Sequence, residues 1–281
     1  MTRLPSDADF IALDFETANR DQDSACSIGL AFVKDGSVVA NPAWLICPPR
    51  LYFDPEFIKI HGIRPEDVEH QPSFADLWPM IKKFLVGCPV IAHNAEFDIK
   101  VLTGTLDRYR LPHPNLNYSC TLRIARKTWP TLRRYNLAAL AEHHGITFNH
   151  HNAGEDACTC AQIALQALNH YNVDSFDQLN TKLCITFGQV FPGGHTPIAT
   201  IPPAVDFTSF GDWNIAIHSQ LQQQSRLERS KELTVAKFDP ATQAAVINGY
   251  TVTLNSCTCH DFTRRKLPCK HMYRLFCGNK E

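Results

Sequence analysis

Residues Phe10-Ile-Ala-Leu-Asp-Phe-Glu16 set two acids, Asp14 and Glu16, into a short apolar run. A run of this length, rich in apolar and aromatic residues, predicts a buried β-strand. Because side chains alternate along a strand, Asp14 and Glu16 leave the same face of the sheet. Two neighbouring acids repel each other there, so the pair either faces water on an edge strand or is neutralised by a cation or strong donors.

Around this strand, short β-rich runs alternate with helical patterns up to about residue 183. Further strands are predicted at 27–33, 37–40, 44–47 and 90–93, the first two joined by a hairpin turn at Asp35-Gly36. Helices are predicted from Ser73 to Phe84 with a kink at Pro79, at 95–106, between Asn136 and Gly145, and at 155–171. This alternation favours an α/β fold with a mixed sheet flanked by helices.

Two further acidic motifs stand at the starts of predicted helices. His93-Asn94-Ala95-Glu96-Phe97-Asp98 opens the helix at 95–106, and His151-Asn-Ala-Gly-Glu-Asp156 opens the helix at 155–171. Acids in a first helical turn are also favoured by the helix dipole alone. That interpretation explains each motif singly, but it does not explain all three motifs in this order.

The three motifs together resemble those of the DEDDh 3'-5' exonucleases, the group of the proofreading epsilon subunit of bacterial DNA polymerase III. The resemblance covers about residues 8–170. Between the motifs, the segments that also match are 24–29, His61-Gly62-Ile63 and 120–126. It implies a ribonuclease H-like fold. The related DEDDy group carries Tyr four residues before the last acid. That position is Asn152, which favours the His subtype with His151 in the motif and leaves His150 at the wrong spacing. Cys120 stands where relatives often have Asp, an acid outside the metal ligands.

The resemblance implies a catalytic site for phosphodiester hydrolysis. Its four metal ligands would be Asp14, Glu16, Asp98 and Asp156. Two cations about 3.5–4 Å apart would offset the charge of these acids, and hard oxygen ligands suit Mg²⁺ or Mn²⁺. His151 would accept the proton of the attacking water. Candidates for contact with the terminal nucleotide are Thr17, His61, Asn94 and Phe97.

Prolines and glycines interrupt the pattern between residues 184 and 211. They predict a linker between an exonuclease domain at 1–183 and a C-terminal region at 212–281. The two parts differ in charge, because 1–183 carry 17 Lys and Arg against 21 Asp and Glu, whereas 212–281 carry 10 against 6.

Cys257-Thr-Cys259 and Cys269-Lys-His271 form a Cys₃His set that suits a structural, tetrahedral Zn²⁺. Strands at 234–238, 244–247 and 250–254 with a following helix predict a small unit over about 234–278, stabilised largely by the metal. The pattern resembles a SWIM zinc finger, which implies a nucleic-acid or protein interaction module. Cys277 or His260 could replace one ligand. Phosphate contact is predicted for the surrounding basic residues Arg264, Arg265, Lys266, Lys270 and Arg274.

The chain has 281 residues and a net charge of -1, which excludes binding to nucleic acid by bulk charge alone. It carries no recognisable secretion signal and no apolar run of about 20 residues, so a cytoplasmic protein without membrane contact is predicted. The expected function is a metal-dependent 3'-5' exonuclease acting on 3' ends of DNA, since the motifs most resemble the polymerase-associated branch. The alternatives are an exoribonuclease and a non-catalytic nucleic-acid-binding adaptor, although no metal ligand is lost.

Overall fold

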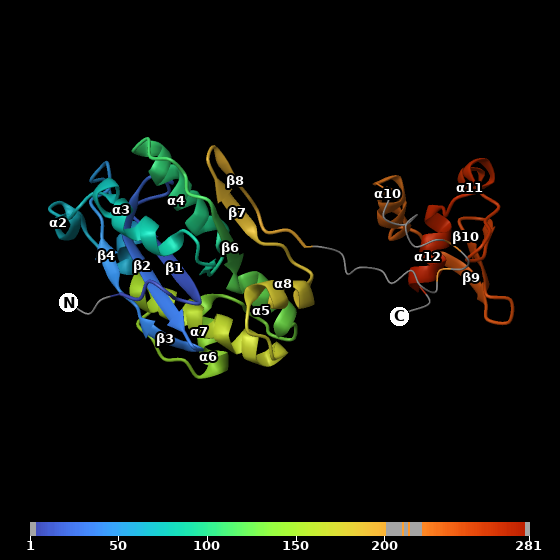
Figure 1. Ribbon diagram of the computed structural model, residues 1–281, viewed down its shortest axis with the longest axis horizontal. Helices are drawn as coiled ribbons and strands as arrows, with labels where there is room; N and C mark the ends of the chain where they lie inside the picture. Colours follow the sequence, from blue (N-terminus) through green and yellow to red (C-terminus); the bar gives the residue numbers. More distant parts are fainter. Residues whose placement is uncertain (1–3, 201–209, 211–212, 214–220, 279–281) are drawn as a thin grey trace. The chain divides into compact units, whose positions relative to one another are not determined.

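A computed structural model describes residues 4–200, 210, 213 and 221–278. The chain separates into two compact units, residues 1–202 and 203–281, which are drawn in Figure 1. Among the described residues, no helix has both the length and the apolar character needed to cross a bilayer.

The first unit is built on an eight-stranded mixed sheet. Its strands are β1 (Phe10–Thr17), β2 (Ala25–Lys34), β3 (Ser37–Ala40), β4 (Ala43–Leu45), β5 (Val90–Ala92), β6 (Leu116–Cys120), β7 (Gly188–Phe191) and β8 (Gly194–Thr196). The order is β3-β2-β1-β5-β6-β7-β8, with β4 paired to β2. Strands β1, β5 and β6 are mutually parallel. Their carboxyl ends therefore share one edge of the sheet, where Asp14 and Glu16 of β1 approach the motif that follows β5.

Eight helices accompany this sheet within residues 4–200, the part of the first unit that the structure describes. They are α1 (Pro55–His61), α2 (Pro65–Val68), α3 (Phe74–Leu85), α4 (Glu96–Arg108), α5 (Thr121–Thr128), α6 (Leu137–His144), α7 (Ala153–Tyr171) and α8 (Phe176–Leu183). Ser73 and Asp76 form the predicted capping box of α3, which runs unbroken past Pro79. Helix α6 begins at the Asn136 cap and ends at Gly145. The α/β fold with a mixed sheet flanked by helices is therefore confirmed.

The long helix α7 packs against β1 and β2, and one glycine makes that approach possible. A Cβ atom at Gly29 of β2 would overlap the backbone carbonyl of Ala153, so only glycine lets the first turn of α7 come this close. Gly29 pairs with Asp14 across the β1–β2 ladder. The same contact therefore brings Asp156, in the first turn of α7, toward the acids of β1.

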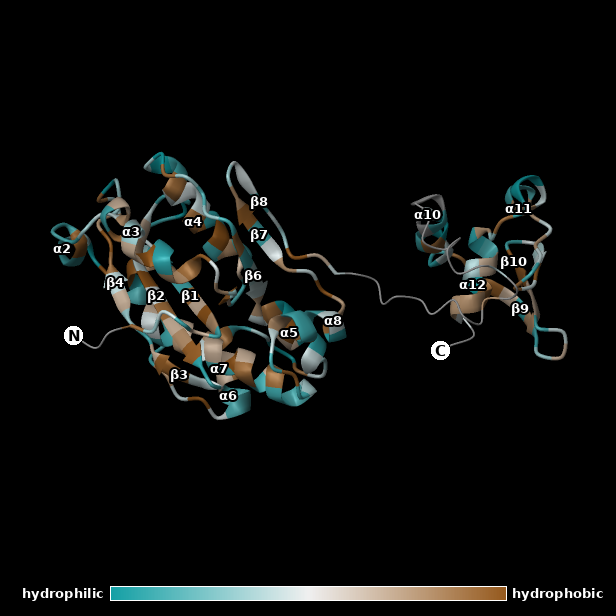
Figure 2. Cartoon of the chain, viewed as in Figure 1, coloured by the Kyte–Doolittle hydropathy of each residue, from teal (hydrophilic) through white to brown (hydrophobic). Residues whose placement is uncertain are grey.

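Hydrophobic colouring follows the central strands and the inner helix faces, whereas the short helices α2 and α11 (His260–Arg265) are hydrophilic (Figure 2). The core of the first unit includes Ile11 and Leu13 of β1, Leu30 of β2 and Ile91 of β5, all fully buried. The acids on β1 thus lie in the second half of a strand whose apolar side chains are buried.

Strands β7 and β8 correct the prediction of a linker that begins at residue 184. Gly193, in the left-handed region with φ 95°, turns a hairpin instead of ending the domain. Strand β7 pairs with β6, and the Tyr118 hydroxyl donates to the Thr196 carbonyl at 3.0 Å. The prolines and glycines were misinterpreted because a short hairpin and a linker share the same composition. Residues 201–209 and 211 of the predicted linker lie outside the described residues.

The second unit contains a three-stranded antiparallel sheet and three described helices. Its elements are α10 (Leu221–Ser230), β9 (Val235–Asp239), β10 (Ala244–Ile247), β11 (Tyr250–Val252), α11 and α12 (Lys270–Gly278). Asn248 and Gly249 both have positive φ, as a type I′ hairpin between β10 and β11 requires. The small core holds Ile247, Val252 and Tyr273, and the three predicted strands and the closing helix are confirmed.

Candidate functional site

The four acids predicted to bind metal ions converge from three elements. Asp14 and Glu16 come from β1, Asp98 from the first turn of α4, and Asp156 from the first turn of α7. Carboxylate oxygens of Asp14, Glu16 and Asp156 lie within 4.8 Å of one another. Asp98 is only 1% exposed and accepts a hydrogen bond from the Phe15 N–H at 3.1 Å, which fixes it beside β1.

Burial and mutual repulsion make the charged forms of these acids unfavourable. Burial raises the pKa of Asp14 well above its usual range, and Asp98, Asp156 and Glu16 raise it further. Burial also raises the pKa of Glu16 to about 8, with added repulsion from Asp156 and Asp98. The pKa of Asp98 rises to about 8 because of burial, although two backbone hydrogen bonds oppose the shift. Divalent cations would reverse this balance, and the all-oxygen donor set fits Mg²⁺ or Mn²⁺.

The shift at Glu16 predicts that the protein free of divalent cations loses stability as pH rises. Its folded pKa of about 8 exceeds the usual value of 4.5, so this contribution is complete below pH 4.5 and lost as pH rises through about 8. We expect urea midpoints of the first unit to fall across this window and to fall less in Glu16→Gln. A midpoint that rises between those pH values in cation-free buffer would contradict the burial argument.

Two histidines, His150 and His151, lie against Asp156. The His151 N–H donates to Asp156 Oδ2 at 2.9 Å, and His150 Nδ1 lies 3.0 Å from Asp156 Oδ1. The two imidazoles stack with centroids 3.8 Å apart. Burial lowers the pKa of His151, with His150 adding and Asp156 opposing. This shift favours the neutral imidazole, the form that can accept a proton. The motif spacing excludes His150 from the motif but does not predict its contact with Asp156. The only sequence signal for this contact is that His150 directly precedes His151.

The four candidates for nucleotide contact occupy different environments. Thr17 is buried, and its carbonyl accepts from His61 Nε2 at 3.1 Å. His61 Nδ1 accepts from the Ile63 N–H at 3.0 Å, so both ring nitrogens of His61 are already bonded within the protein. Asn94 is exposed with φ 61° at the end of β5. Phe97 is 44% exposed beside the buried Asp98, which leaves its ring accessible for stacking.

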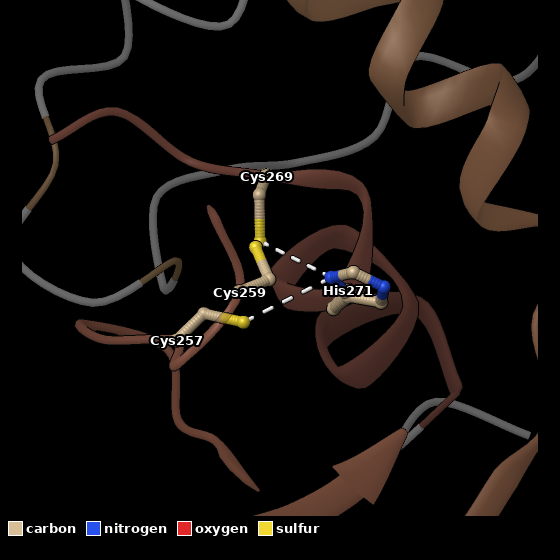
Figure 3. Close-up of side chains that lie close together, drawn as sticks. All are labelled: Cys257, Cys259, Cys269 and His271. Carbon is tan, nitrogen blue, oxygen red and sulfur yellow. Dashed lines mark hydrogen bonds between the residues drawn. The ribbon is translucent and has the colours of Figure 1, made fainter. Parts of the chain in front are cut away.

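The second unit holds a separate cluster of sulfur and nitrogen atoms (Figure 3). Cys257, Cys259, Cys269 and His271 are all buried, and their ligand atoms lie within 4.8 Å of one another. His271 Nδ1 is 3.8 Å from Cys257 Sγ and 3.7 Å from Cys269 Sγ. Ligands of a tetrahedral Zn²⁺ stand about 3.5–3.8 Å apart, so this geometry fits zinc. Neither His260 nor Cys277 belongs to a metal-ligand cluster within the described part of the chain.

Some of the basic residues predicted to surround this cluster contact other side chains of the same unit. Arg265 Nη2 lies 2.6 Å from Asp261 Oδ2, and Arg226 Nε lies 3.0 Å from the same oxygen. Lys266 Nζ lies 5.6 Å from the centroid of the Phe262 ring. The guanidinium of Arg265 is thus already paired with Asp261, which disfavours Arg265 as a phosphate contact. Arg264 is exposed.

Comparison with known protein families assigns a family to each of the two units. A family model described as Exonuclease matches residues 11–164, and one described as SWIM zinc finger matches 250–276. The first match covers more than half of the chain, which therefore belongs to the exonuclease family. The DEDDh resemblance and the C-terminal SWIM zinc finger are thereby confirmed.

Among individual relatives, DNA polymerase III subunit epsilon of Aquifex aeolicus is 32% identical over 168 residues, which are 58% of this chain and 81% of that protein. The 3'-5' exonuclease DinG of Staphylococcus saprophyticus is 28% identical over 173 residues, 60% of this chain and 19% of that protein. The chain therefore matches about a fifth of the length of DinG.

Solved structures agree with this assignment. Exonuclease X in complex with 5' overhanging duplex DNA has a TM-score of 0.50 and 26% identity, over 59% of this chain and 95% of its own. Exonuclease I has a TM-score of 0.51 and 16% identity, over 62% of this chain and 42% of its own, which supports the fold alone.

Proposed function

We propose that the protein is a 3'-5' exonuclease that releases nucleotides from the 3' end of DNA. The observation that carries the proposal is the convergence of Asp14, Glu16, Asp98 and Asp156 at one edge of the sheet. Four acids with raised pKa values are costly unless cations neutralise them. The matched family and the epsilon relative support the reaction type.

In this mechanism the four carboxylates would hold two Mg²⁺ or Mn²⁺ ions. Such ions, when bound, neutralise phosphoryl charge, activate water and stabilise the leaving oxygen. The chain's own residues orient the 3' end and move the proton. The imidazole of His151 accepts the proton of the attacking water, and Phe97 and Asn94 contact the terminal nucleotide. His61 keeps Thr17 in place through its carbonyl.

DNA is the proposed substrate because the epsilon subunit belongs to a DNA polymerase and the Exonuclease X structure contains duplex DNA. RNA is the second candidate. We further propose that residues 1–202 form the catalytic domain and that the zinc finger recruits nucleic acid or a protein partner in the cytoplasm. A non-catalytic adaptor is disfavoured because all four acids are present.

The test uses matched DNA and RNA strands, single and duplex, labelled at the 5' end. We expect a ladder that shortens from the 3' end in Mg²⁺ or Mn²⁺, that is absent in EDTA and in Asp156→Ala, and that forms faster on DNA. A faster ladder on RNA would reassign the substrate. If the protein binds the strands but leaves them intact in every condition, the exonuclease proposal is rejected in favour of a non-catalytic adaptor.

Replacing His151 with alanine is expected to lower kcat about 10²–10⁴-fold with little change in KM, because the variant lacks the proton acceptor. The matched control is His150→Ala, which removes the neighbouring imidazole that contacts the same acid. We expect a loss of less than about tenfold in this control. Steady-state kinetics on a 5'-labelled strand measures both, and a larger loss in His150→Ala would transfer the role of base to His150.

A further inference from the structure

The segment from Thr121 to Asn136 has an unusual charge for its unit. It carries five of the 17 basic residues of 1–183 and none of the 21 acids. The five are Arg123, Arg126, Lys127, Arg133 and Arg134, all exposed. A locally positive surface on an otherwise acidic domain either binds an anionic partner or is simply exposed to solvent.

Three of these cations border a pocket on helix α5. Arg123, Arg126 and Lys127 are spaced three and four residues apart, so they share one helix face. The pocket has a volume of about 310 Å³. Its lining also includes Asn94 at the end of β5 and Ile198.

The cations of this pocket have no acidic partner among the residues that the structure describes. Glu96 is the one acid in the described lining, and its Oε1 lies 3.2 Å from Lys100 Nζ instead. Unpaired cations that share a concave surface are suited to a ligand with several negative charges.

The pocket adjoins the proposed active site. Asn94, a candidate for terminal-nucleotide contact, lines it directly. His93 connects the two regions, because its Nδ1 lies 2.9 Å from the hydroxyl oxygen of Thr121, the first residue of α5. The pKa of His93 is lowered to about 4, chiefly by burial, with the charges of His150 and Arg126 contributing. His150 in turn lies 3.0 Å from Asp156. The basic face of α5 therefore begins beside the acids and leads away from them.

We propose that Arg123, Arg126 and Lys127 bind the phosphodiester backbone of a single strand a few nucleotides before its 3' end. This inference rests on the proposed function and names the surface that guides the strand into the site. The positive face also offsets the repulsion between an incoming phosphate and the four carboxylates. Phosphodiester chemistry is shared by DNA and RNA, so the proposal concerns the backbone and not the sugar.

The test measures binding of 5'-fluorescent single-stranded DNA and, in parallel, RNA to the full chain in the Asp14→Ala background. The patch variant is Arg123→Ala with Arg126→Ala, and the matched control is Lys82→Ala with Lys83→Ala in the last turn of α3. We expect the patch variant to bind about tenfold more weakly. The slope of log Kd against log salt should fall by about 1.4, because two phosphate contacts are lost.

A small ester, p-nitrophenyl thymidine 5'-monophosphate, separates this inference from the proposed function. With Asp14 restored, the patch variant should cleave the ester at the wild-type rate but degrade long strands with a raised KM. Unchanged strand affinity and salt slope in the patch variant would overturn the inference, even if the wild type degrades DNA. If the wild type cleaves nothing, the proposed function fails while the binding comparison still decides the inference.

Discussion

Asp98→Asn is expected to lower the rate of 3'-end hydrolysis about 10³-fold. Loss of one metal ligand removes several kcal/mol of charge stabilisation in the transition state, which corresponds to a factor of this size. Asparagine retains the size of the side chain and an oxygen that can accept from the Phe15 N–H, so the fold is preserved. Initial rates on a 5'-labelled strand in Mg²⁺ measure the change.

The same variant should be more stable than the wild type in cation-free buffer. Burial raises the pKa of Asp98 to about 8, so the folded protein without cations must keep this acid protonated at neutral pH, a cost in stability that asparagine avoids. Mg²⁺ should then raise the unfolding temperature of the wild type more than that of the variant. Asp35→Asn is the control, since either residue suits the Asp35-Gly36 turn. A variant that is inactive but less stable without cations would refute the electrostatic explanation.

Loss of zinc is expected to unfold the C-terminal unit and leave the exonuclease unit folded. Structural Zn²⁺ contributes about 10–16 kcal/mol of apparent binding free energy in small fingers, more than a small core supplies. Cys269 is fully buried within the four-ligand cluster, so Cys269→Ser should release the metal. Hydrogen exchange should lose protection across 250–276 and retain it across 11–164.

Cys277→Ser is the matched control for zinc loss, because this cysteine lies outside the four-ligand cluster. It should keep one Zn²⁺ per chain by elemental analysis and normal hydrogen exchange. Full protection and unchanged zinc content in Cys269→Ser would show that the unit does not depend on this cluster.

Much of the fold could be predicted because local signals agreed with the tertiary structure. The apolar run of β1 and the Asn136 cap of α6 specify their elements without distant contacts. Helix α8 is as short as α6 and was missed despite its Ser175 cap, because it ends at Cys184 in the left-handed region and not at a glycine that would mark its end. The β7–β8 hairpin was missed because its pairing with β6 is a long-range contact.

The candidate site was predictable in its residue types and less so in its contacts. Motif order identified the acids, but their proximity depends on the approach of α7 to Gly29. The stacking of His150 on His151 depends on the backbone before α7, where His151 has φ 69°. The pairing of Arg265 with Asp261 was missed because the helix at 260–265 was not predicted; on a helix, their four-residue spacing brings them together.

The most direct test of the account counts cations at the four carboxylates. Mn²⁺ binding to the zinc-loaded protein, followed by electron paramagnetic resonance, should give two ions per chain. Asp14→Asn should bind fewer, and Asp35→Asn should match the wild type. Wild-type protein that binds no Mn²⁺ at these acids, or an Asp14→Asn variant that binds as much as the wild type, would contradict the claim that they form a two-cation site.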